Sequence, residues 1–221
     1  MPKGLQPKGV ARRNKMLLAA VQLFLENGYE KTTTAAIARA AGMAPSSFFA
    51  AFENKEALLL TLVQQMFNRQ FENAEQLLGV QKDPLMLYGI ETALQMYITE
   101  LSEPLRELYV MAYSLPTTCE YIYNNTAERL SVIFADYLPE AEKKDFYEMD
   151  IASGGITRGF MAKHCHLYFK IEDTASAVLF YTLSGAQGEA GCSDRCGIRG
   201  GSAIYRTKID RRYHRAGASG I

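Results

Sequence analysis

Helical periodicity is the feature of this sequence that most restricts its fold. Apolar residues recur three and four positions apart along most of the chain, as do Leu17, Val21, Phe24 and Leu25. The sequence lacks a convincing alternation of apolar and polar residues, which is the pattern of a half-buried strand. We therefore expect an all-α fold in which each helix buries one apolar stripe against its neighbours.

Glycine and proline mark where the predicted helices begin and end. The first helix should run from Arg12 to about Asn27, because Gly28 stands where a glycine often ends a helix. Four prolines lie near the starts of later helices, where proline is tolerated: Pro84, Pro104, Pro116 and Pro139. These later helices are expected at residues 84–101, 104–114, 117–137, 142–168 and 171–185.

A stretch in the first quarter of the chain has the pattern of a helix-turn-helix. Thr32 or Thr33 can cap a short helix that stops at Gly42. Pro45 suits the first turn of another short helix, which should end near Phe52. Two short helices joined by a glycine-containing turn form this motif, and the second is narrow enough for a major groove about 12 Å wide.

The net charge of zero conceals an uneven distribution of charge along the chain. Residues 1–55 contain eight basic and three acidic residues, a net charge of +5. Residues 56–185 have a net charge of −9, and residues 186–221 have a net charge of +4. A basic head on an acidic body indicates that the head meets a polyanion, although a solvated basic surface is the simpler alternative.

The run ENGYEKTTTAAIARAAGMAPSSFFAAFENKEALL resembles the DNA-binding head of the TetR family of transcriptional regulators. The matching residues are Phe24, Gly28, Tyr29, Thr32, Ile37, Ala38, Ala41, Gly42, Phe48, Phe52, Lys55, Glu56 and Leu58. The resemblance implies a homodimer in which each subunit joins a three-helix helix-turn-helix head to a helical body for ligand binding and dimerisation. We expect a basic arm (1–9), a DNA-binding head (10–68), this body (69–185) and an irregular basic tail (186–221).

The predicted contacts with double-stranded operator DNA fall into two groups. The phosphate contacts are assigned to Arg12, Arg13, Thr32, Thr33 and Lys55. Basic side chains, hydroxyls and helix N-termini suit this role because they attract or hydrogen-bond phosphate oxygens. The edge that faces the bases should contain Ala44, Pro45, Ser46, Ser47, Phe49 and Ala50.

This reading edge departs from the pattern of the family that it resembles. The family commonly has serine at position 44, tyrosine at 49 and a polar residue near 50–51, where this chain has Ala44, Phe49, Ala50 and Ala51. Ala44 cannot cap a helix, and Phe49 cannot donate a hydroxyl to phosphate. We expect either low selectivity or an operator with many thymine contacts.

Aromatic side chains in the middle of the chain favour a pocket for a small lipophilic or aromatic effector. The candidate lining residues are Tyr88, Tyr97, Tyr109, Tyr113, Tyr121 and Tyr123. The alternative is that these rings pack the core. By the same resemblance, helices 142–168 and 171–185 would form the dimer interface, where Gly154, Gly155 and Gly159 permit close approach.

The tail after Gly185 loses the helical pattern and is rich in glycine and arginine. Either a change of reading frame replaced the original C-terminus, or a native basic tail assists DNA binding. His164, Cys165 and His166, with Cys192 and Cys196, invite a metal hypothesis, but their spacing is not that of a zinc site. We expect neither a metal nor a cofactor.

The leading hypothesis is a ligand-responsive transcriptional regulator, most simply a repressor that an effector releases from its operator. The alternative is a helical ligand-binding or scaffolding dimer with a vestigial head. An enzyme is not expected, because phosphate loops, nucleophile elbows and clustered metal ligands are missing from the sequence. Sparse cysteines and the lack of long apolar runs or a secretory signal favour the cytoplasm rather than a membrane.

Overall fold

The computed structural model describes residues 7–78, 84–136, 138–167 and 169–190. Their secondary structure consists of α1 (Pro7–Asn27), α2 (Thr34–Ala40), the 3₁₀ turn η1 (Pro45–Ser47), α3 (Lys55–Leu78), α4 (Pro84–Leu101), α5 (Glu103–Ala112), α6 (Pro116–Ile133), α7 (Lys143–Met161) and α8 (Ile171–Ala190). The all-α prediction is therefore confirmed. Among these helices, none has the length and apolar character needed to cross a membrane.

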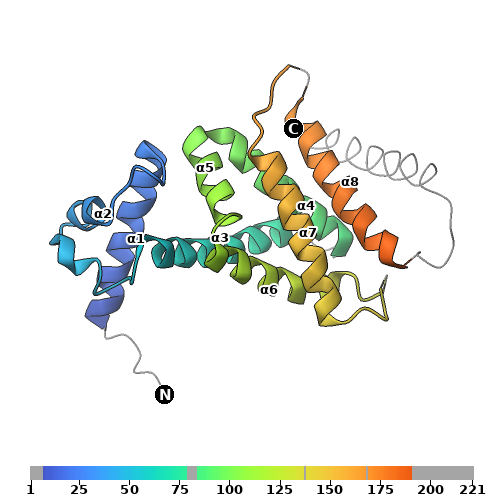
Figure 1. Ribbon diagram of the computed structural model, residues 1–221, viewed down its shortest axis with the longest axis horizontal. Coiled ribbons are helices and arrows are strands. Elements are labelled where there is room, and N and C mark those ends of the chain that lie inside the picture. Colours follow the sequence, from blue (N-terminus) through green and yellow to red (C-terminus); the bar gives the residue numbers. More distant parts are fainter. Residues whose placement is uncertain (1–6, 79–83, 137, 168, 191–221) are drawn as a thin grey trace.

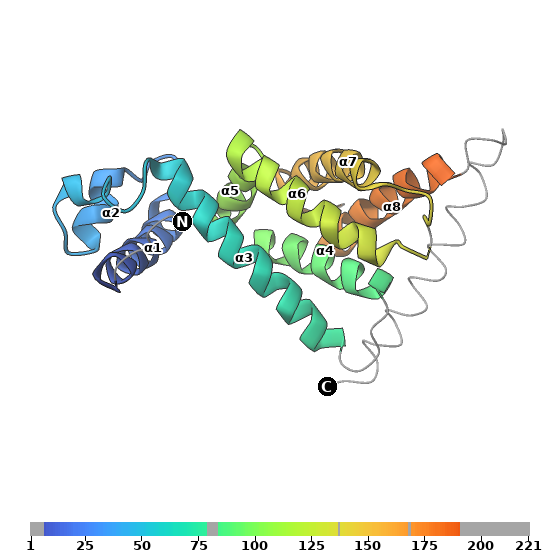
Figure 2. The ribbon, with the colours of Figure 1, turned by 90° about the horizontal axis from the view of Figure 1, so that it is seen from below.

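The helices form a small head and a larger body. Figure 1 shows α1 and α2 at one end of the elongated molecule, with α4 to α8 packed together at the other end. Helix α3 leaves the head and runs along the body, as the perpendicular view in Figure 2 also shows. The chain therefore continues from one unit into the other through a single helix.

The head is shaped by two left-handed glycines and one cap. Gly28 and Gly42 have φ angles of 82° and 75°, so each ends its helix in a conformation that costs glycine little. The Thr33 side chain caps α2 by accepting a hydrogen bond from the Ala36 N–H at 3.1 Å. These features confirm the predicted cap at the start of α2 and the predicted helix ends at Gly28 and Gly42.

The prediction of a regular short helix from Pro45 to Phe52 is wrong. The structure has the single 3₁₀ turn η1 followed by further turns, and Ala44 at the start of η1 makes no capping bond. Without a side-chain oxygen at position 44, the first N–H groups have no local acceptor to extend a regular helix. The Phe52 N–H still donates to the Phe48 carbonyl at 2.9 Å, so the segment turns as the motif requires.

Several predicted helix boundaries in the chain also shift. Helix α1 begins at Pro7 rather than Arg12, and α6 ends at Ile133 rather than 137. Helix α7 begins after a capping box between Glu142 and Asp145 and ends at Met161, short of the predicted residue 168. Helix α8 continues to residue 190, past the predicted end at 185, and the rest of the predicted tail lies outside the described residues.

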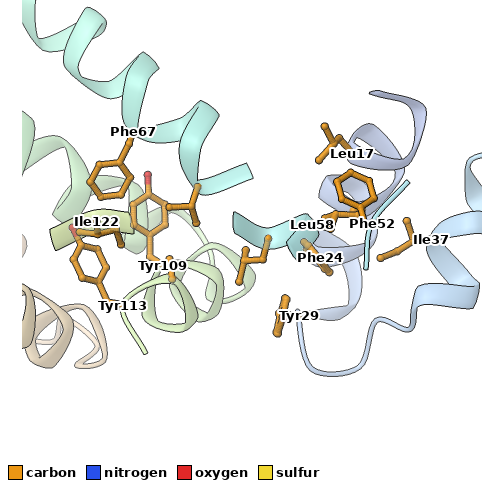
Figure 3. Close-up of a cluster of buried hydrophobic side chains, with 14 of the residues drawn as sticks. Leu17, Phe24, Tyr29, Ile37, Phe52, Leu58, Phe67, Tyr109, Tyr113 and Ile122 are labelled. Carbon is orange, nitrogen blue, oxygen red and sulfur yellow. The ribbon is translucent and has the colours of Figure 1, made fainter. Parts of the chain in front are cut away.

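Helix α3 supplies side chains to the packing of both units. In the head, Leu58 is fully buried with Phe24 and Ile37, while Phe67 and Tyr109 pack in the body. Figure 3 shows the two groups side by side, with Phe67 and Tyr109 in one and Leu58, Phe24 and Ile37 in the other. The apolar stripe of α3 therefore holds the head and the body together.

We predict that Gly42→Ala lowers the free energy of unfolding by roughly 1 kcal/mol, because a Cβ disfavours positive φ. Space is not the cause, since a Cβ at Gly42 would meet no atom within 4 Å. The matched variant is Gly42→Asn, which tolerates this conformation better and should cost less. Equal losses for both variants in denaturant unfolding would contradict the backbone explanation.

Candidate nucleic-acid interface and internal cavity

The outer edge of the helix-turn-helix is exposed and mostly apolar. Ala44, Pro45, Ser46 and Ala50 are exposed, and Ser47 is half-buried. The structure thus brings the predicted base-facing residues together on one edge of the head.

Two adjacent phenylalanines fix the direction of this edge. Phe48 is fully buried, whereas 63% of Phe49 is exposed. Their rings meet edge to face, with centroids 5.6 Å apart. Phe48 also packs on Phe52, which is 3% exposed, so this buried pair anchors the segment and directs Phe49 outward.

Two of the predicted phosphate contacts are engaged inside the head. The buried Thr32 hydroxyl donates to the Gly28 carbonyl at 2.8 Å. The Lys55 ammonium donates to the carbonyls of Tyr29 at 2.8 Å and Thr32 at 3.2 Å, and it lies 4.1 Å from the centroid of the Tyr29 ring. Both side chains stabilise the loop between α1 and α2, and a phosphate would have to compete with these bonds.

Arg13 is also occupied within the head. Its guanidinium donates to the Ala51 carbonyl at 3.2 Å and to the Thr61 hydroxyl at 2.9 Å, and it stacks 4.4 Å from the Phe52 centroid. It therefore ties the reading segment to α1 and α3. Arg12 and Thr33 are exposed, and they remain the available candidates for phosphate among the five predicted residues.

The body contains a small cavity between α3, α4, α6, α7 and the residue that follows α5, Tyr113. Its lining residues are Phe67, Phe71, Tyr88, Glu91, Thr92, Gln95, Tyr113, Thr126, Asp150, Ser153, Gly154 and Thr157. The space for the centres of water-sized molecules is about 20 Å³. This amount accommodates roughly one water molecule, so an organic ligand would require side chains or helices to move apart.

The predicted pocket tyrosines are only partly brought together. Tyr88 and Tyr113 line the cavity. Tyr109 is buried beside it, where its hydroxyl accepts from the Gln70 amide. Tyr97, Tyr121 and Tyr123 are not among the lining residues, and 45% of Tyr97 is exposed.

Two buried acids line the cavity, and the sequence analysis missed both. Glu91 on α4 and Asp150 on α7 are each only 4% exposed. Burial raises the pKa of Glu91 to about 7, while the Gln95 hydrogen bond and Arg129 lower it. Burial likewise raises the pKa of Asp150 to about 8, against the hydrogen bond from Ser153. Their positions on buried helix faces are the signal that could have found them.

A hydrogen-bond chain links one of these acids to α5. The Gln95 amide donates to Glu91, and the Tyr113 hydroxyl donates to Gln95 Oε1 at 2.9 Å. Asp150 accepts from the Ser153 hydroxyl at 3.1 Å through Oδ1, whereas its buried Oδ2 has no hydrogen-bond partner. The cavity therefore presents both a connected network and an unused acceptor.

Helix α5 also carries the contact between body and head. The Glu107 carboxylate accepts the Glu30 N–H at 2.9 Å, in the loop after α1. A Cβ at Gly28 would overlap this carboxylate and displace it, while the φ angle of Gly28 is the feature that favours glycine there. Helix α5 thus contacts the head through Glu107, and Tyr113 at its C-terminal end reaches the cavity.

The three glycines predicted at a dimer interface have different surroundings. Gly154 is buried against Tyr123 and Tyr113, inside the body. Gly155 and Gly159 are exposed on α7, and a Cβ at either would meet open space. Only these two are therefore placed to meet another molecule.

The residues behind the metal hypothesis do not converge where the structure describes them. His164 Nε2 lies 3.0 Å from Glu103 Oε2, and the Cys165 sulfur lies 3.7 Å from the Thr174 hydroxyl. Within the described ranges, no group of three or more His, Cys, Asp or Glu residues could hold a metal ion. Cys192 and Cys196 lie outside those ranges.

Comparison with known proteins identifies relatives of the head and of the fold. The family model for bacterial regulatory proteins of the tetR family matches residues 16–62. The HTH-type transcriptional repressor Rv1474c of Mycobacterium tuberculosis is 36% identical over 87 residues, 38% of this chain and 46% of that protein. The uncharacterized HTH-type transcriptional regulator YvkB of Bacillus subtilis is 29% identical over 163 residues, 72% of this chain and 78% of that protein.

The chain spans about half the length of the first of these relatives. Among solved structures, the TetR family repressor FadR of Thermus thermophilus, in complex with lauroyl-CoA, has a TM-score of 0.61 at 18% identity. The alignment covers 86% of this chain and 99% of that one, so the similarity in fold extends over head and body.

We predict that folding stability falls with rising pH because of the two buried acids. Folding raises their pKa values from 4.5 and 3.8 to about 7 and about 8, so it favours the neutral carboxyls. Their contribution to the free energy of unfolding is fully present below the pKa values of the unfolded chain. It is lost as pH rises through the pKa values of the folded chain. The double variant Glu91→Gln, Asp150→Asn should therefore become more stable relative to the native chain as pH rises from about 5 to about 8.5, by several kcal/mol.

Denaturant unfolding between about pH 5 and pH 8.5 measures this difference. Glu148→Gln is the control, because Glu148 is an exposed acid on the same helix as Asp150. The difference in free energy of unfolding between the native chain and the double variant should change with pH. If it does not, folding leaves both pKa values at their ordinary values and the prediction is wrong.

Proposed function

We propose that the chain belongs to the tetR family of bacterial regulatory proteins, as the match of its head indicates, and that it is a transcriptional regulator that binds operator DNA through this head. The observation that carries this proposal is the exposed edge around Ser46 and Phe49, held outward by buried Phe48 within the segment that the family model matches. The most economical form is a repressor that leaves its operator when a small lipophilic or aromatic effector binds the body. No catalytic role is part of this proposal, and the proposed site of action is the cytoplasm.

The exposed edge would dock in the major groove. Ser46 and Ser47 can donate or accept hydrogen bonds with base edges, and Phe49 and Ala50 suit contact with thymine methyl groups. Thr33 at the start of α2 and Arg12 on α1 would bind the flanking phosphates. Arg13, Thr32 and Lys55 then act one step away from the DNA, by holding the reading segment in place.

Helix α5 offers a physical route from effector to head. Because the cavity is smaller than an organic molecule, binding would push its walls apart, including Tyr113 at the C-terminal end of α5. Buried Arg106 holds α5 to its neighbours through Glu100 at 2.7 Å and the Met161 carbonyl at 3.1 Å. Helix α5 would therefore shift as a unit, and its shift would reach the head through Glu107.

A homodimer would place two heads on a palindromic operator. Helices α7 and α8 support this assembly, because they expose Ile151 (44%), Tyr181 (53%) and the glycines Gly155 and Gly159. Apolar and small side chains on neighbouring helices allow close packing between subunits.

The second candidate is a ligand-binding or scaffolding dimer with a vestigial head. The apolar character of the reading edge favours it, since Arg and Asn, which read bases by paired hydrogen bonds, are missing from residues 44–51. Selection of bound sequences from random DNA separates the two candidates. Enrichment of one palindromic sequence supports the regulator, whereas ligand binding without any enrichment supports the scaffold.

We predict that Phe49→Ala weakens binding to the selected operator by roughly 1–2 kcal/mol while changing folding stability by less than about 0.5 kcal/mol. The reason is that Phe49 is exposed and its proposed partner is a base. Leu77→Ala is the control, because Leu77 is a similarly exposed apolar residue on the body part of α3. Fluorescence anisotropy at two salt concentrations measures the affinity. Unchanged affinity for Phe49→Ala would place the reading face elsewhere.

We predict that Glu107→Ala accelerates hydrogen exchange of the Glu30 amide roughly tenfold, because the variant removes its acceptor from the body. Glu172→Ala, which removes an exposed acid from α8, should leave this amide unchanged. Exchange rates that match the native chain in both variants would remove α5 from the proposed route.

A further inference from the structure

We propose that the internal cavity recognises an organic cation, such as an aromatic amine, through the carboxylates of Glu91 and Asp150. This inference rests on the proposed function, because it names the chemical class of the effector that the body would bind. It follows from three features of the cavity: its buried acids, the shortage of positive charge around them and its aromatic walls.

The two acids come from different helices and line the same small space. Glu91 and Asp150 are both at least nine-tenths buried, yet neither takes part in any ion pair found among the described residues. Asp150 Oδ2 also has no hydrogen-bond partner. A buried carboxylate without a counter-charge is unfavourable, so a ligand that supplies positive charge would be strongly preferred over a neutral one.

Arg129, the basic residue that affects the pKa of Glu91, compensates only part of the effect of burial. Its guanidinium stacks 3.6 Å from the Phe71 centroid and contacts Asn68 Oδ1 at 3.4 Å, so other partners also engage it. No basic residue contributes to the pKa of Asp150.

The walls of the cavity suit the rest of such a ligand. Four lining side chains are aromatic: Phe67, Phe71, Tyr88 and Tyr113. Aromatic faces attract cations and also pack against the ring of an aromatic amine. An anionic ligand would instead be repelled by the ionised acids, and a neutral phenol would not stabilise their ionised forms.

Isothermal titration calorimetry of the full chain at about pH 8 tests this inference with three probes of similar size. Benzylammonium is the cation, benzyl alcohol the neutral probe and benzoate the anion. We expect benzylammonium to bind roughly tenfold more tightly than benzyl alcohol, and benzoate to bind most weakly. In Glu91→Gln, Asp150→Asn, affinity for benzylammonium should fall roughly tenfold while affinity for benzyl alcohol stays within about twofold.

The exposed control Glu148→Gln should behave like the native chain. Equal binding of cation and alcohol, tighter binding of benzoate, absence of benzylammonium binding at millimolar concentration, or an undiminished preference in the double variant would each overturn the inference. Operator binding without ligand is measured separately. A chain that binds DNA but shows no cation preference retains the proposed function, whereas cation preference without DNA binding retains only the cavity assignment.

Discussion

The continuity of α3 is the constraint on which the rest of the structure depends. This 24-residue helix is about 36 Å long; it buries Leu58 in the head and Phe67 and Phe71 in the body. Because a helix resists bending, a displacement of its body half must be transmitted to the head or absorbed by repacking. A second contact, between Glu107 and the Glu30 N–H, helps to set the orientation of the head relative to α3 and the body.

The body buries polar side chains that a typical protein core excludes. Glu91, Gln95 and Tyr113 form a connected chain, and Asp150 faces them with one oxygen unused. Such an arrangement lowers stability at neutral and alkaline pH relative to an apolar core. The proposed binding site explains why the protein tolerates this loss of stability. A bound cation would stabilise the ionised carboxylates, and it can do so only when it occupies the cavity.

The head demonstrates how a short motif can be predicted well in outline and less well in detail. Gly28, Gly42 and Thr33 act through their own backbone or an N–H three residues away, so local sequence specified their roles. The regularity of the segment after Pro45 was overestimated, because the missing cap at Ala44 weakens a helix that its apolar spacing favours. The predicted roles of Arg13 and Lys55 omitted the carbonyls that other parts of the head bring to them.

The sequence alone determined the all-helical fold, the helix-turn-helix and the outward position of Phe49, because these depend on periodicity and on residues a few positions apart. Only the tertiary structure decided which tyrosines reach the cavity, and that Glu91 meets Asp150 there. The latter two residues are 59 positions apart on different helices. Their shared burial arises because α4 contacts α6 and α6 packs against α7, and no local sequence pattern encodes that arrangement.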